Sequence, residues 1–133
     1  MPAVSVGDTA DSTLDVTAER IDSFAEVSGD TNPLHLDAKY AEASMFDGRI
    51  AHGMLAAGAV SAALANLPGE VVYLSQNLDF QNPIRPGETV TATATVVETL
   101  DGDKVRVETV AETNETVLTG EAVVLSLPRA APT

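Results

Sequence analysis

Apolar residues near the N-terminus recur at the spacing of an amphipathic helix. Ile21, Phe24 and Ala25 stand three and four residues apart, and acidic residues occupy several of the neighbouring positions. This spacing places the apolar side chains on one face. We expect a helix over residues 18–28, with Thr17 as its N-cap.

The next segment lacks that pattern. Pro33 disfavours the helical conformation at Asn32, so residues 31–36 are expected to be irregular. Asp37 suits the N-cap of a second short helix over residues 38–43.

Residues 53–67 form the most apolar run of the chain. They are mostly alanine, leucine, methionine and valine, with almost no polar face, and Pro68 follows them. A helix that is apolar on nearly every side must be enclosed by other structure. Its fifteen residues would measure about 22 Å, enough to cross a curved sheet, so we expect it to be the central element.

After residue 70 apolar positions alternate with polar ones, which is the pattern of half-buried strands. The Asp-Gly pair within residues 100–103 predicts a tight hairpin, residues 113–115 a second turn, and Gly120 a bulge. Helices followed by hairpin strands predict an α+β fold with a five-stranded antiparallel sheet. We expect its strands at about residues 13–16, 71–80, 90–96, 105–109 and 116–127.

Length and charge narrow the class of protein. A chain of 133 residues is expected to form one domain, residues 1–133. Twenty acidic residues against seven basic ones give a net charge of -13, so nucleic acid is not an expected partner. The acidic residues are scattered through periodic segments, which we interpret as the surface of a halophilic protein; an ordinary acidic protein is the alternative.

The sequence contains no cysteine, and it lacks the patterns of a secretory signal and of a membrane-spanning helix. Without cysteine, disulfides, thiolate metal ligands and a cysteine nucleophile are excluded. The start of the chain lacks the pattern of a secretory signal, and the longest apolar stretch is shorter than the about 20 residues that cross a bilayer. We expect a soluble, cytoplasmic protein with no membrane partner.

The chain's chemistry concentrates around its only two histidines. Asp30 and His35 stand five residues apart in the segment GDTNPLHLD, and His52 is followed at once by Gly53. A carboxylate and an imidazole that share a water could perform general acid–base catalysis. The structural alternatives are an Asx-turn between Asp30 and Asn32, and a hydrogen-bonded core histidine at His35.

Four segments carry a family pattern in this order: FAEVSGDTNPLHLDAKYA, FDGRIAHGMLAAGAVSAAL, YLSQNLDFQNPIRPGETVTATATV and TGEAVV. They resemble the MaoC-like branch of the hot-dog fold and, more narrowly, the (R)-specific enoyl-CoA hydratases. The resemblance implies an antiparallel sheet wrapped around the long helix. It also implies addition of water to a trans-2-enoyl-CoA to give the (R)-3-hydroxyacyl-CoA, with coenzyme A as part of the substrate and no metal or redox cofactor.

The same resemblance implies roles for individual residues. Asp30 and His35 match the catalytic pair, and Gly53 matches the residue whose backbone N–H receives the thioester oxygen. Ser61 matches a serine that lines the acyl pocket, although a serine on a buried helix commonly bonds the carbonyl one turn earlier. Asn32 matches an asparagine that keeps the loop in shape.

Two further residues are candidates for substrate binding. His52 is expected to bond the loop backbone, with a substrate contact as the alternative. Arg85 could meet a phosphate of coenzyme A, or could be an ordinary solvated loop arginine. The histidine spacing matches no zinc pattern, so no metal site is expected.

The resemblance also implies a homodimer, or a dimer of dimers, in which the sheets join edge to edge. Rival functions are another reaction of the same fold, either thioester hydrolysis or dehydration of a 3-hydroxyacyl group on an acyl carrier protein. A non-catalytic acyl-CoA-binding subunit is a rival of a different class. The sequence leaves the length and branching of the acyl chain open.

Overall fold

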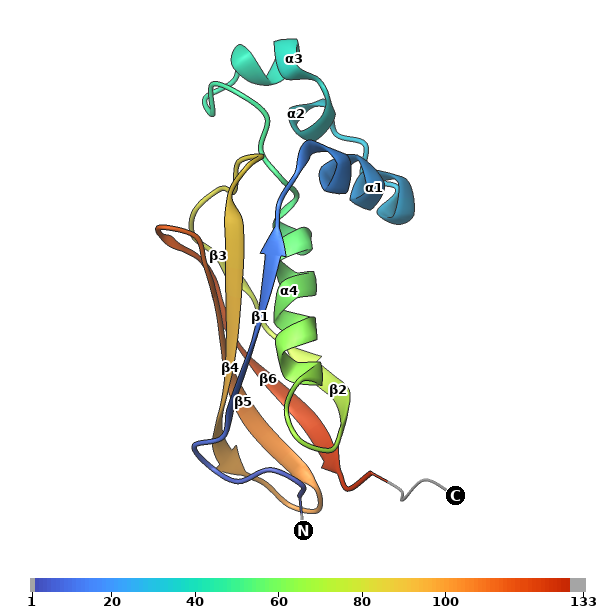
Figure 1. Cartoon of the computed structure of the whole chain (residues 1–133), viewed down its shortest axis with the longest axis vertical. Coiled ribbons are helices and arrows are strands. Elements are labelled where there is room, and N and C mark those ends of the chain that lie inside the picture. Colours follow the sequence, from blue (N-terminus) through green and yellow to red (C-terminus); the bar gives the residue numbers. More distant parts are fainter. Residues whose placement is uncertain (1, 130–133) are drawn as a thin grey trace.

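A curled antiparallel sheet packs against one long helix in the computed structural model, which describes residues 2–129 (Figure 1). Five strands follow the order β1-β4-β5-β6-β2, and the short β3 also pairs with β6, so the predicted α+β class and five-stranded sheet are confirmed. The elements are β1 (Thr9–Asp15), α1 (Ala18–Ser28), α2 (Pro33–Leu36), α3 (Ala38–Glu42), α4 (Gly53–Ala65), β2 (Glu70–Gln76), β3 (Asp79–Phe80), β4 (Thr89–Thr99), β5 (Lys104–Glu112) and β6 (Thr116–Leu127).

The core lies between α4 and the concave face of the sheet. Every second residue of β4 and β5 is buried, which is the periodicity expected of strands with one face on a core. Small side chains meet at this contact, among them Ala56 and Ala59 of α4 and Ala92 and Ala94 of β4. Their size lets the helix backbone approach the sheet closely.

Within the described chain only one face of α4 is enclosed, so enclosure on nearly every side would require the second copy that the resemblance implies. The helix packs mainly on β4 and β1, and its buried residues are Ala56, Ala59, Val60, Ala63 and Leu64. Met54, Gly58 and Ser61 on the opposite face are exposed in the described chain. Composition could not reveal this, because a single sheet contacts one side of a helix whatever the other side contains. The helix also ends at Ala65 rather than at residue 67.

The N-terminal helices follow their capping residues. Thr17 accepts the backbone N–H of Arg20 at 3.1 Å, and α1 ends at Gly29, whose φ of 79° is left-handed. The expectation that residues 31–36 are irregular is wrong, because residues 33–36 form α2. Proline disfavours the helical conformation in the residue before it, but it suits the first position of a helix, where its missing N–H would have no partner within the helix.

The predicted second short helix is confirmed as α3, which ends at Glu42 rather than at residue 43. Asp37 caps it by accepting the backbone N–H of Tyr40 at 3.1 Å. Together α1, α2 and α3 gather at the N-terminal end of α4 (Figure 1).

The edge of the sheet differs from the prediction. The single strand expected over residues 71–80 is split into β2 and β3, and Val72, Leu74 and Phe80 are exposed. Alternation of apolar and polar residues does not predict burial in an edge strand, because no further element of the chain covers the apolar side chains. At the other edge, β1 begins four residues earlier than expected, at Thr9.

Gly120 does not form the predicted bulge. It pairs with Thr109 in regular register, and the register of β5 and β6 shifts instead between Ala111 and Glu112. A close backbone contact explains why this residue is a glycine: a Cβ at this position would lie 2.0 Å from the backbone oxygen of Asn77. The missing side chain therefore lets the segment after β2 lie directly against β6.

Candidate active site

Asp30, His35 and His52 come together at the N-terminal end of α4. Asp30 lies in the loop between α1 and α2, His35 in α2, and His52 at the N-cap of α4. One carboxylate oxygen of Asp30 and one ring nitrogen of each histidine all lie within 4.8 Å of one another. The fold therefore places the predicted acid and imidazole at one point.

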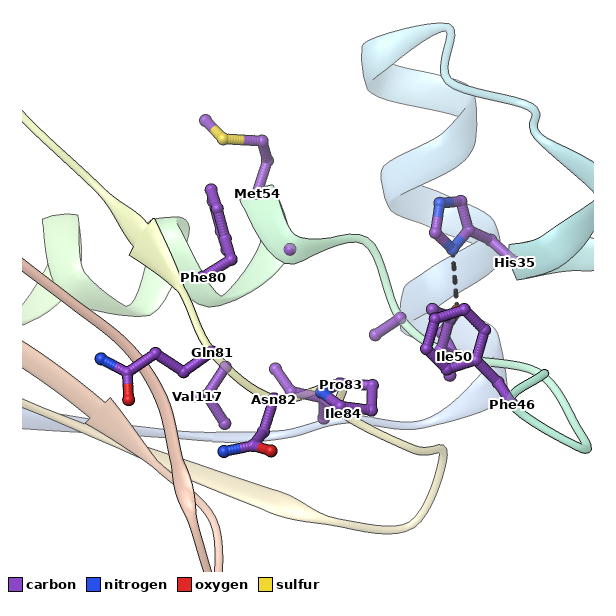
Figure 2. A pocket seen from close by; sticks show the side chains of 12 residues that line it. His35, Phe46, Ile50, Met54, Phe80, Gln81, Asn82, Pro83, Ile84 and Val117 are labelled. Carbon is purple, nitrogen blue, oxygen red and sulfur yellow. Dashed lines mark hydrogen bonds between the residues drawn. The ribbon is translucent and has the colours of Figure 1, made fainter.

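Backbone contacts hold the half-buried ring of His35. Its Nδ1 lies 2.8 Å from the carbonyl oxygen of Ile50, the contact drawn as a dashed line in Figure 2. A carbonyl only accepts hydrogen bonds, so Nδ1 carries the hydrogen and Nε2 of the neutral ring keeps a lone pair. Arg49 donates from Nε to the backbone oxygen of His35 at 2.6 Å.

Asp30 keeps acceptor capacity although its carboxylate shapes the loop. The N–H of Asn32 donates to Asp30 Oδ1 at 3.3 Å, which is the Asx-turn considered as the structural alternative. Asn32 in turn accepts the N–H of Leu34 at 3.0 Å and so begins α2. A carboxylate has about four lone-pair sites, so this turn leaves Asp30 able to bind a water as well.

His52 is buried and joins the loop to the helix. Its Nε2 lies 2.9 Å from the backbone oxygen of Asp30, so this nitrogen carries the hydrogen and makes the loop contact expected of it. Its ring stacks on that of His35 with centroids 3.9 Å apart and planes at 29°. The ring of Phe24 also lies against that of His52, with centroids 4.9 Å apart and planes at 57°. Within the described residues, His52 Nδ1 has no hydrogen-bond partner.

Gly53 begins α4 directly after His52. A Cβ at this position would lie 2.7 Å from the ring of Phe80, so a larger residue would displace that ring. Backbone N–H groups in the first turn of a helix lack partners within the helix and face the positive end of its dipole. The position therefore suits the binding of a negatively charged oxygen.

Two cavities meet at this end of α4. The first has a volume of about 450 Å³, and its lining includes His35 and Gly53. The second has a volume of about 500 Å³, and its lining includes Phe24 and Ser61. Met54 lines both. In Figure 2 His35 lies on one side of the first cavity and Met54 on the other.

Two predicted residues, Ser61 and Arg85, lie apart from the pair Asp30 and His35, which we call the dyad. Ser61 lies in the second cavity, two turns along α4 from Gly53. Arg85 donates from Nη2 to the backbone oxygen of Phe46, which lines the first cavity. Its guanidinium thus lies near that opening, where an anionic group of a ligand could reach it.

Sequence reasoning missed the aromatic side chains of the site. The sequence indicates only that Phe24 lies on the apolar face of its helix and that Phe80 belongs to an alternating strand. Both sit against the N-terminal end of α4, through His52 and Gly53 respectively. Tyr73 was also missed; it lines the second cavity, and burial raises the pKa of its hydroxyl above the ordinary value.

The chain belongs to the MaoC-like family, because the family model described as "MaoC like domain" matches residues 4–118. It is 45% identical over 95 residues to the (R)-specific enoyl-CoA hydratase of Rhodospirillum rubrum. The matched region covers 70% of this chain and 66% of that protein, just under two thirds of its length. It is 35% identical over 127 residues to the (R)-specific enoyl-CoA hydratase of Aeromonas caviae, covering 92% of this chain and 95% of that protein.

Solved structures agree in fold. The unliganded R-hydratase PhaJ1 of Pseudomonas aeruginosa has a TM-score of 0.88 and 35% identity, over 99% of this chain and 92% of its own. The (R)-hydratase of A. caviae involved in PHA biosynthesis has a TM-score of 0.88, and the match covers 95% of this chain and 98% of that one. The predicted family and hot-dog fold are confirmed, and the names of these relatives agree with the prediction of a hydro-lyase. No helix among the described residues is long and apolar enough to span a membrane.

Proposed function

We propose that this protein is an (R)-specific enoyl-CoA hydratase, which adds water to a trans-2-enoyl-CoA to give the (R)-3-hydroxyacyl-CoA. The observation that carries the proposal is the approach of Asp30 and His35 beside the N-terminal end of α4, with their polar atoms within 4.8 Å. That separation is short enough for one water to bond both groups.

Asp30 and the unprotonated Nε2 of His35 hold the reacting water. As the water oxygen bonds to C3 of the enoyl group, the dyad takes one of its protons, and a proton returns to C2. One water supplying both groups to one face makes the addition syn. General acid–base catalysis of this kind contributes about 10²- to 10⁴-fold to the rate.

Gly53 provides the second part of the reaction. Negative charge builds on the thioester oxygen when C3 is attacked, and the backbone N–H at the start of α4 stabilises it. One donor in such an oxyanion hole is worth about 3 to 4 kcal/mol. Neither step uses a metal or a redox cofactor, so activity should survive dialysis against EDTA.

Charge supports an assignment of the two cavities. Arg85 donates to the backbone oxygen of Phe46 and Arg49 to that of His35, and both acceptor residues line the first cavity. None of the described residues that line the second cavity is charged. We therefore assign the coenzyme A arm to the first cavity and the acyl chain to the second, with Ser61 in its wall.

Exposed apolar surface supports a homodimer. Val72 and Leu74 of the edge strand β2 are exposed, as is Met54 on the uncovered face of α4. An edge strand with apolar side chains invites pairing with another chain. We propose that a second copy covers this surface through β2, either as a dimer or within a dimer of dimers; sedimentation analysis of Leu74→Glu against wild type tests it.

The acidic surface supports salt adaptation. Repulsion within a chain of net charge -13 weakens as salt shortens the Debye length from about 10 Å at 0.1 M to about 3 Å at 1 M. We propose that the folded protein is a halophilic one and gains stability from molar salt.

The decisive assay uses crotonyl-CoA in high salt. Loss of absorbance from the enoyl thioester, without release of free thiol, supports a hydratase. Release of thiol would instead support a thioesterase, and saturable binding without turnover a binding subunit. Running the reaction from the 3-hydroxyacyl side, on coenzyme A and on acyl carrier protein, separates the hydratase from a carrier-protein dehydratase.

A further inference from the structure

A chain of hydrogen bonds begins in the wall of the second cavity, which is lined mainly by apolar residues and also by Ser61 and Ser75. Tyr73 and Gln76 of β2 both line this cavity. The hydroxyl of Tyr73 lies 2.9 Å from Gln76 Oε1. Gln76 Nε2 lies 2.8 Å from the backbone oxygen of Asn77 and 3.0 Å from Oγ1 of the buried Thr109.

These contacts fix the direction of every hydrogen bond from Asn77 to Tyr73. The backbone oxygen of Asn77 can only accept, so the atom of Gln76 facing it must be the amide nitrogen. Gln76 Oε1 therefore faces Tyr73 and can only accept, so the Tyr73 hydroxyl donates its hydrogen there. The oxygen of Tyr73 is left with lone pairs and no hydrogen to donate elsewhere.

The anchor of this chain is rigid. Asn77 donates its N–H to the backbone oxygen of Glu121 at 3.0 Å, and its Oδ1 accepts the N–H of Glu121 at 2.6 Å. Gly120 permits this contact, because any Cβ there would overlap the Asn77 carbonyl. The Gln76 amide thus cannot reverse without losing its bond to that carbonyl.

We propose that Tyr73 is a specificity-determining residue that accepts a hydrogen bond from the acyl group, and that the preferred substrates are enoyl thioesters whose acyl chain ends in a hydroxyl. This inference rests on the proposed function and on the assignment of the acyl chain to the second cavity. A hydroxyl can donate to the fixed acceptor, whereas a carboxylate cannot. The ordinary pKa of a tyrosine hydroxyl is about 10, and burial raises that of Tyr73 further, so the hydroxyl carries its hydrogen at neutral pH.

Binding of saturated analogues tests the inference without requiring turnover. We would titrate ω-hydroxypentanoyl-CoA, hexanoyl-CoA and pentanedioyl-CoA into the wild-type protein and into Tyr73→Phe, in high salt. The first two ligands have equal length and differ by a hydroxyl in place of a methyl group. Tyr40→Phe is the matched control, because Tyr40 is the chain's other tyrosine and is exposed on α3.

The expected result is selective. Tyr73→Phe weakens binding of the hydroxy ligand about two- to twelvefold relative to hexanoyl-CoA, the range of a single neutral hydrogen bond, while Tyr40→Phe leaves the ratio unchanged. In the wild type the dicarboxylic ligand binds more weakly than the hydroxy ligand. An unchanged ratio in Tyr73→Phe, or tighter binding of the dicarboxylic ligand, overturns the inference.

Failure of the proposed function is a separate result. Absence of crotonyl-CoA hydration would overturn the hydratase proposal, whereas the binding ratio would still report what Tyr73 recognises. Hydration of crotonyl-CoA together with an unchanged binding ratio would keep the hydratase and remove Tyr73 from specificity.

Discussion

The rings of His35 and His52 stack with centroids 3.9 Å apart, and of the two it is the buried His52 ring that bonds the backbone oxygen of Asp30. His52 donates to the backbone oxygen of Asp30, so it holds the loop that carries the carboxylate and the ring that carries the base. We interpret His52 as a positioning residue.

Replacing His52 should separate its hydrogen bond from its ring. His52→Leu leaves the Asp30 carbonyl without its donor and should lower kcat about 10- to 100-fold with a smaller change in KM, because small misplacements of a catalytic group cost that much. His52→Gln keeps an amide nitrogen at the place of Nε2 and should recover most of the loss. Steady-state kinetics on crotonyl-CoA measure both, and equal rates for the two variants would contradict this role.

The dyad itself predicts a larger effect. Asp30→Asn and His35→Ala should each lower kcat about 10²- to 10⁴-fold, because each removes one of the groups that move protons. Circular dichroism should show an unchanged fold, since Asp30 is exposed in a loop and the half-buried His35 is not part of the apolar core.

A matched control for the dyad is Asp37→Asn. Asp37 is also exposed and lies near the same loop, but its carboxylate caps α3 by accepting the N–H of Tyr40. Asparagine caps about as well as aspartate, so activity and stability should stay near wild type. A loss equal to that of Asp30→Asn would show that charge in this region, rather than the dyad, sets the rate.

Gly53→Ala should reduce activity by a steric route. The added Cβ would meet the Phe80 ring at 2.7 Å, which forces the ring or the helix start to move and disturbs the N–H that binds the oxyanion. We expect a fall in kcat of about tenfold or more, up to the roughly 10²- to 10³-fold loss of an oxyanion donor.

Two further variants identify the cause. At Gly58, on the same helix, a Cβ would meet nothing within 4 Å, so Gly58→Ala should raise the free energy of unfolding by up to about 1 kcal/mol. Phe80→Leu combined with Gly53→Ala relieves the overlap. Recovered activity in the double variant would assign the loss to the ring, and continued loss to the N–H.

Local rules explain which parts of the molecule the sequence could predict. Helix α1, the start of α4 and the hairpin at residues 100–103 follow from caps, periodicity and an Asp-Gly turn, all read within a few residues. Proximity of Asp30 and His35 follows from their spacing in one short loop.

The unpredicted features depend on distant contacts. The stacking of His35 on His52 and the bond between Gln76 and Thr109 join residues 17 and 33 positions apart. Periodicity describes which face of an element is apolar, but not which other element meets it. The apolar pattern alone does not predict the open face of α4, because its composition is as apolar as the buried face; the fold resemblance does, because a single hot-dog sheet leaves the helix partly uncovered.

Salt should stabilise the protein through its charge. Among the described residues, Arg49 pairs with Asp22 and Arg106 with Glu98 and Glu121, so few of the twenty acidic side chains have a cationic partner in an ion pair. The remaining carboxylates repel one another, and mobile cations screen this repulsion in the folded state more than in the expanded chain, where the charges are already far apart. The melting temperature should therefore rise from dilute buffer to molar KCl. Sucrose at matched water activity is the control for general exclusion effects, and a melting temperature that stays flat in KCl would refute salt adaptation.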